Sequence, residues 1–275
     1  MRDFGETQGF STYNALQLSA RKQFSHGLSF LVSYTWSKTL TNSENLFNEF
    51  SGFTQDFYNQ RGEKALSLND YPQSLVFSYQ YELPFGPGRK WANAGGASGK
   101  VLGGWMIAGV QQYRSGAPQM IVTGNSLNPY MGPNSFIARA SVVPGVNKRS
   151  AAYLNGTWDP NALGDAGSTL NSAAWTAPAP YTFGDAPRTD GAIRQFPFYN
   201  EDISIIKRTR ITERVNVEFR ADFLNVFNRV LFGFDQGGDQ YGSIIGGGSL
   251  GGGLGHVSAQ SNFPREIQFG LKINY

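Results

Sequence analysis

Residues 28–38, LSFLVSYTWSK, decide the fold, because apolar or aromatic side chains alternate along them with mostly small polar ones. Every second position from Leu28 to Trp36 is apolar, whereas serine, threonine and one leucine occupy the positions between them. Such alternation is typical of a β-strand whose two faces lie in different environments. A turn-forming stretch at 25–27 separates this run from an earlier alternating run, so the sequence predicts a β-hairpin.

The same period-two pattern recurs along the chain. It predicts seven strands, near residues 14–24, 28–38, 73–83, 105–116, 198–208, 214–227 and 264–275. Several runs reach the length that a tilted strand needs to cross a bilayer, and aromatic residues lie near the ends of their apolar faces, as in membrane barrels. For the run 105–116 the sequence does not decide which face is apolar, because Met106 and Val110 share a face with Arg114. The predicted fold is all-β: a segment of an antiparallel transmembrane β-barrel with long extracellular loops.

The composition argues against several other classes of protein. Only 16% of the 275 residues are charged, against about 25% in soluble domains. No cysteine is present, which excludes disulfides and thiol chemistry. The two histidines, His26 and His256, lie in no metal-ligand spacing and are expected in turns or loops, so no metal site is predicted. A net charge of +3 without a basic stripe gives no reason to expect nucleic acid binding, and no apolar run is long enough for a transmembrane helix.

The connections between the predicted strands alternate between long and short. If Tyr275 ends in the periplasm, the loops 39–70, 117–197 and 228–255 are extracellular, and the turns at 25–27 and 209–213 are periplasmic. The exception is the inner segment 84–104, which is long for a hairpin turn. Seven strands is an odd number, and no signal peptide begins the sequence, so we expect further strands outside it. An eighth strand within 117–197 or 1–10 is the alternative.

The polar positions of these strands are the candidate lining of a wet lumen. They are Gln17, Arg21, Gln80, Glu82, Asp202, Glu218, Arg220, Asp222, Gln268 and Lys272. On a strand, Arg220 lies between Glu218 and Asp222 and is expected to pair with both, in a charge ladder cross-paired with residues such as Asp202. We favour this ladder over a catalytic carboxylate pair. A serine nucleophile needs a histidine base in reach, so neither an enzyme nor catalytic residues are expected.

A glycine-rich stretch and the terminal strand complete the sequence features. Residues 246–251, GGGSLG, match a dinucleotide-binding pattern by letter, but no helical pattern follows them, so no cofactor is predicted. The terminal strand alternates apolar residues and ends in an aromatic one, and its edge suits pairing with another sheet. Its candidate assembly signal consists of Ile267, Phe269, Leu271, Ile273 and Tyr275.

Several motifs resemble the outer-membrane TonB-dependent receptors of the Oar-like type. They are YNALQ (13–17), YTWSK (34–38), YELPFG (81–86), GGW (103–105) with SGAP (115–118), FRADFLNVFN (219–228) and PREIQFGLK (264–272). The resemblance implies the C-terminal portion of a barrel of about 22 strands that an N-terminal plug closes. It also implies a location in the bacterial outer membrane and uptake of an unknown ligand with energy relayed by TonB. The implied partners are outer-membrane lipid, the barrel-assembly machinery, and TonB through the absent N-terminal region.

Two other functions remain open. A structural or adhesion barrel would use its long loops, above all 117–197, to bind a surface partner without transport. A secreted β-sandwich or lectin-like domain would also show alternation, although its strands are usually shorter.

Overall fold

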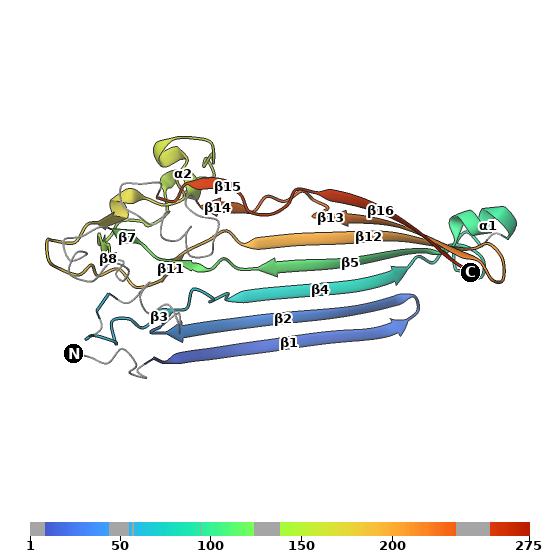
Figure 1. Ribbon diagram of the computed structural model, residues 1–275, viewed down its shortest axis with the longest axis horizontal. Coiled ribbons are helices and arrows are strands. Elements are labelled where there is room, and N and C mark those ends of the chain that lie inside the picture. Colours follow the sequence, from blue (N-terminus) through green and yellow to red (C-terminus); the bar gives the residue numbers. More distant parts are fainter. Residues whose placement is uncertain (1–8, 44–54, 57, 94, 124–137, 235–253) are drawn as a thin grey trace.

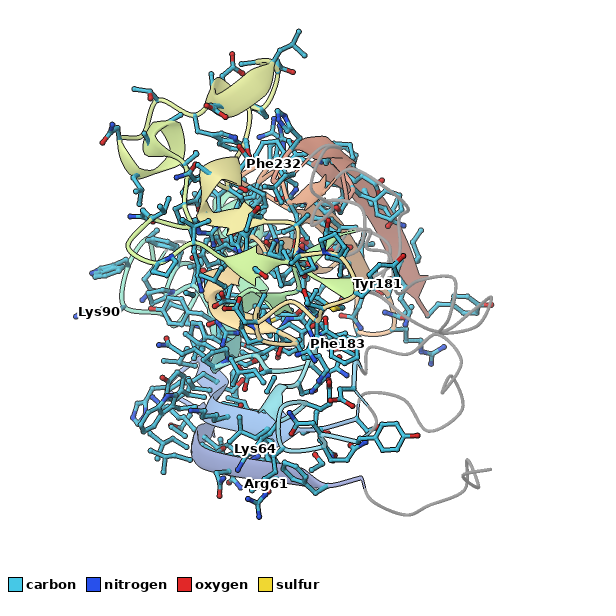
Figure 2. The ribbon with its side chains drawn as sticks, turned by 90° about the vertical axis from the view of Figure 1, so that its left-hand side faces the viewer. Arg61, Lys64, Lys90, Tyr181, Phe183 and Phe232 are labelled. Carbon is cyan, nitrogen blue, oxygen red and sulfur yellow. The ribbon has the colours of Figure 1, made fainter. Side chains whose placement is uncertain are left out.

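The computed structural model describes residues 9–43, 55–56, 58–93, 95–123, 138–234 and 254–275 as one long antiparallel sheet with an irregular cap at one end (Figure 1). The sheet follows the order β1-β2-β4-β5-β12-β13-β16, and the short strand β3 pairs with β2. Viewed along its strands, the sheet curves as an open arc (Figure 2). The predicted all-β antiparallel fold is confirmed.

Each of the seven predicted ranges overlaps one long strand. The long strands are β1 (Ser11–Ser25), β2 (Leu28–Thr41), β4 (Gln73–Glu82), β5 (Trp105–Arg114), β12 (Phe198–Arg210), β13 (Asn216–Leu224) and β16 (Glu266–Asn274). The short strands are β3 (Ala65–Leu66), β6 (Pro118–Gln119), β7 (Val122–Thr123), β8 (Ala138–Arg139), β9 (Ser141–Val142), β10 (Trp175–Thr176), β11 (Asp190–Arg194), β14 (Phe232–Phe234) and β15 (Val257–Gln260). The helices are α1 (Gly96–Leu102), α2 (Ala151–Leu154), η3 (Gly164–Ala166) and η4 (Ser172–Ala174). No helix in the described ranges has the length and apolar character needed to span a membrane.

The strand register sorts the side chains into two faces. One row across six strands, which defines the apolar face, consists of Phe30, Tyr79, Gly109, Ile203, Phe223 and Ile267. The adjacent row, which defines the polar face, consists of Ser29, Gln80, Ala108, Ser204, Asp222 and Gln268. Successive residues of a strand point to opposite sides, so the rows lie on opposite faces. The register also resolves β5: Trp105 belongs to the apolar face, and Met106 and Arg114 to the polar face.

Gly109 has no side chain to contribute to the apolar row, and a side chain of the neighbouring strand β4 covers this position. A Cβ atom at this position would lie 2.8 Å from the Tyr79 hydroxyl oxygen, because the tyrosine ring covers the glycine. The same ring stacks on Phe77, with 5.1 Å between ring centroids. An aromatic side chain thus shields the backbone that the glycine leaves bare.

The two ends of the sheet differ. At the turn end, His26 (φ 53°) and Gly27 (φ 80°) close the first hairpin. At the loop end, β13 stops at Leu224, before the predicted residue 227, because Asn225 adopts a left-handed conformation (φ 48°). The Asn225 amide then holds the turn, accepting from the Arg229 backbone N–H at 2.8 Å and donating to the Arg229 carbonyl at 2.9 Å.

The described part of 117–197 adds no strand to the main sheet. Its strands have two to five residues, and they pair only in separate two-stranded sheets. The alternative of an eighth strand within 117–197 or 1–10 falls partly on residues 1–8 and 124–137, which lie outside the described residues.

The long connections pack together into a loop-end cap, made by residues 55–56, 58–72, 117–123, 138–197 and 254–260. The cap has its own apolar core, which consists of Ile121, Ala140, Leu170, Ala174, Trp175, Ile193 and Leu254. These residues come from segments more than 130 positions apart, so the cap joins separate loops into one folded unit.

Candidate ligand site on the polar face

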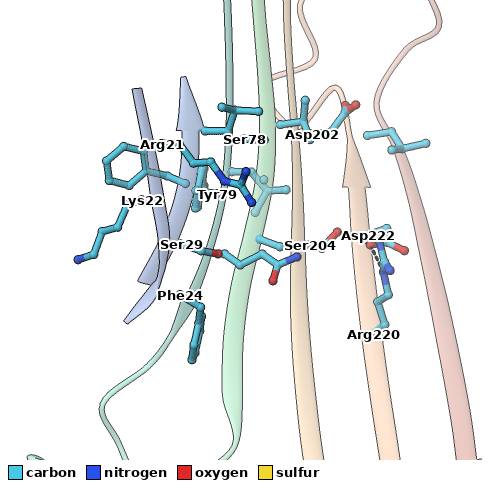
Figure 3. A pocket seen from close by; sticks show the side chains of 18 of the residues that line it. Arg21, Lys22, Phe24, Ser29, Ser78, Tyr79, Asp202, Ser204, Arg220 and Asp222 are labelled. Atoms are coloured by element: carbon cyan, nitrogen blue, oxygen red, sulfur yellow. Dashed lines mark hydrogen bonds and ion pairs between the residues drawn. The ribbon is translucent and has the colours of Figure 1, made fainter. Parts of the chain in front are cut away.

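A cavity of about 720 Å³ lies against the polar face (Figure 3). Six of the predicted lumen residues line it: Arg21, Gln80, Asp202, Arg220, Asp222 and Gln268. The other four, Gln17, Glu82, Glu218 and Lys272, share this face by strand alternation but are outside the lining. The fold thus brings charged and amide groups from five strands around one hollow.

The charged contact of the cavity lies within β13, and a hydroxyl of β12 joins it. Arg220 Nε donates to Asp222 Oδ1 at 2.6 Å, and the Ser204 hydroxyl donates to the same oxygen (Figure 3). Arg220 also reaches Ser204 Oγ at 3.3 Å. Because the Arg220 side chain stays 52% exposed, a cation and neighbouring acceptors face the hollow together. Such a set can hold a polar solute by hydrogen bonds.

The predicted ladder was wrong in two of its pairings. Arg220 pairs with Asp222 alone, whereas Glu218 binds Arg208, directly opposite it on β12, at 2.7 Å. Directly opposite residues are closer than second neighbours along one strand, so the cross-strand partner wins. Asp202 is not cross-paired with the ladder but accepts from the Asn225 backbone N–H at 2.8 Å, which secures the loop-end turn.

Neither histidine belongs to the cavity. His26 lies in the first hairpin turn and His256 in the cap, next to β15. Within the described ranges, no group of three or more histidine and acidic side chains could hold a metal ion.

The predicted assembly residues lie on the edge strand β16. Ile267, Phe269, Leu271 and Ile273 are each more than half exposed on the apolar face, and Tyr275 is fully exposed. Phe269 stacks on Phe219 of β13, with 6.1 Å between ring centroids. In the described sheet β16 has a single neighbour, so its outer edge is open to another strand, and its role in assembly stays a prediction.

A buried ion pair ties two loops of the cap together. Arg139 Nη2 contacts Glu63 Oε1, and both side chains are at most 5% exposed. The same Glu63 oxygen accepts from the backbone N–H groups of Gln55 and Asp56, each at 3.1 Å. Burial lowers the pKa of the Arg139 guanidinium from its ordinary value, and the Glu63 charge opposes this shift. Arg188 reinforces the joint, donating to the Glu63 carbonyl at 3.0 Å.

A polar cluster on the apolar face was not predicted from the sequence. Glu201 of β12 faces the same way as Ile203 and Ile205, yet its side chain is only 2% exposed. Arg229 Nε donates to its two carboxylate oxygens at 2.9 and 2.8 Å. The sequence signal that could have revealed this site is Glu201, a single acidic residue at the same alternate positions as Ile203 and Ile205.

A double-mutant cycle tests the cluster. Glu201→Gln, Arg229→Gln and the double variant should give a coupling energy of about 1 kcal/mol, at the low end for a contacting pair, because water screens the 44% exposed Arg229 side chain. The measurement is urea unfolding of the full chain in lipid vesicles. Additive effects of the two single changes would show that the ion pair contributes no stability.

The two faces define the class of protein. Strands long enough to cross a bilayer, apolar on one side and polar with a hollow on the other, form the wall of a transmembrane β-barrel. The chain belongs to the family described as "Outer membrane beta barrel domain", which matches residues 3–268. The protein is therefore located in the bacterial outer membrane, with its apolar face toward lipid. No curated protein and no solved structure matches the chain.

Proposed function

We propose that the chain forms part of the barrel of a TonB-dependent receptor, which takes up a polar ligand through its lumen. The observation that carries this proposal is the open arc. Among the described residues, β1 and β16 each have one neighbour in the main sheet, and unpaired edges are absent from a closed barrel. Six antiparallel pairings separate these edge strands, so they run in the same direction. Antiparallel closure then needs an odd number of further strands, which agrees with a barrel of about 22.

The polar face and the cap support the same role. Arg220, Asp222 and Gln268 offer hydrogen-bonding groups along the hollow, and the cap is a folded unit on the side where a ligand would enter. We expect no enzymatic activity in this arrangement. TonB would act through a plug that closes the lumen.

The test compares strains of the source bacterium on a panel of sole carbon and iron sources. One strain lacks this gene, one lacks TonB, and one carries Arg220→Ala with Asp222→Ala. We expect the first two to lose growth on the same source, because uptake needs both proteins, and the third to grow slowly on it. A growth defect that the TonB deletion does not share would contradict energised uptake.

Adhesion is the second candidate, and the separate core of the cap favours it. Replacing residues 138–197 with a Gly/Ser linker distinguishes the two functions. A receptor loses ligand uptake, whereas an adhesin loses surface attachment and keeps growth on every source. Heat-modifiable gel mobility checks that the shortened barrel is still assembled.

A further inference from the structure

The segment 84–104 at the turn end is longer than its connection requires. The other connections at this end, at 26–27 and 211–215, are tight turns. The longer segment contains α1 and leaves four large apolar side chains exposed: Phe85 (36%), Trp91 (52%), Val101 (66%) and Leu102 (44%). Single exposed apolar residues are common on protein surfaces, but four in one short segment indicate a contact surface.

This segment is fastened to the apolar face, at its rim. Trp105 and Lys207 lie opposite each other in that face, and the Lys207 ammonium lies 5.5 Å from the Trp105 ring centroid. Lys207 Nζ donates to the carbonyl oxygens of Lys100, at 2.6 Å, and of Gly103. Trp105 Nε1 donates to the Val101 carbonyl at 3.0 Å. The exposed side chains of α1 therefore continue the lipid-facing surface of the barrel wall.

The charge of the segment has one sign. Residues 84–104 contain Arg89, Lys90 and Lys100 and no acidic residue. Arg89 binds Glu82 of β4 at 2.8 Å, so the net positive charge of the segment comes from Lys90 and Lys100. The Lys90 ammonium lies 5.3 Å from the Trp91 ring centroid, and Figure 2 shows Lys90 standing clear of the ribbon, away from Tyr181 and Phe183. Tryptophan and lysine together suit the boundary between acyl chains and headgroups, where the ring is half buried and the ammonium reaches phosphate.

We propose that residues 84–93 and 95–104 form an interfacial apron that binds anionic phospholipid headgroups in the membrane leaflet at the turn end. Trp91, Val101 and Leu102 enter the acyl boundary, and Lys90 and Lys100 contact the phosphates. The continuity of the apron with the lipid-facing wall and its net positive charge, carried by Lys90 and Lys100, favour this occupant over a protein. The inference depends on the outer-membrane barrel and not on transport.

A nitroxide label tests the apron in the full chain. The chain has no cysteine, so Val101→Cys provides a single attachment site on α1. The chain is reconstituted in vesicles of phosphatidylcholine, with or without phosphatidylglycerol, and an aqueous relaxation agent measures how much of the label is exposed to water. We expect the anionic lipid to draw the label into the bilayer. High salt should weaken this effect, because it screens the charges.

Charge variants separate this binding from general insertion. Each lysine near an anionic surface favours the bound state about fivefold, so Lys90→Gln with Lys100→Gln should shift the equilibrium about thirtyfold toward water. The control, Arg61→Gln with Lys64→Gln, removes the same charge from the loop end and should leave the label buried. A label equally exposed to water with and without anionic lipid would overturn the proposal and indicate a protein-facing surface. An unchanged response in the Lys90 and Lys100 variant would also overturn it.

Discussion

Replacing Glu63 with alanine will open the loop-end cap while the sheet stays folded. Arg139 would keep its charge at 4% exposure without its carboxylate, and two backbone N–H groups would lose their acceptor. Removing one partner of a buried ion pair costs about 3–5 kcal/mol. Hydrogen exchange of the full chain in vesicles measures the effect, as loss of protection at residues 138–197 with the amides of β4 and β5 still protected.

Two further variants define the cause. Asp165→Ala removes an exposed carboxylate from the same cap and should leave the protection unchanged. Glu63→Leu combined with Arg139→Met removes both charges and should recover part of the lost protection, since no buried charge is left alone. Recovery should be incomplete, because the N–H groups of Gln55 and Asp56 still lack an acceptor. Equal protection in wild type and Glu63→Ala would show that the ion pair does not hold the cap.

The second large effect concerns the two faces of β16. Phe269→Arg should destabilise the barrel by about 2–4 kcal/mol, because it places a cation among lipid chains near the middle of the strand. It also removes the stack on Phe219. Urea unfolding in vesicles, followed by heat-modifiable gel mobility, gives the free energy of unfolding.

The neighbouring residue provides the matched control. Gln268→Arg adds the same charge one position earlier, but on the polar face, where Gln268 lines the cavity. Its effect on the free energy of unfolding should be close to zero. Equal losses from the two variants would show that β16 does not separate lipid from lumen.

The strands and their faces could be predicted because both depend on neighbours within one short run. Alternation in 28–38 places Phe30 and Val32 on one side and Ser29 and Ser33 on the other, whatever the rest of the chain does. The position of β13 followed in the same way. The residue at which β13 ends could not be predicted in this way. Asn225 turns the chain there through hydrogen bonds to Arg229 and to Phe263, which is 38 positions away.

The pairing of charges was less accessible from the sequence. Second-neighbour spacing suggested that Arg220 binds Glu218, but Arg208 lies directly opposite that acid once β12 and β13 are in register. The acid of Glu201 was visible as an exception in an apolar row, yet its partner Arg229 lies 28 positions away, beyond a turn. Both ion pairs depend on how neighbouring strands align and where the chain turns, and these features are set by contacts between strands that are separate in the sequence.

The sequence by itself determined the class of fold, the two faces of the wall and the alternation of long and short connections, because each follows from a local period. Only the tertiary structure decided what the long connections do. It joins Glu63 to Arg139, 76 residues away, inside a cap with its own core, and it fastens residues 84–104 to the lipid-facing rim through Lys207. These contacts join segments that are distant in the chain, and a local alternation of side chains carries no information about which distant segments come together.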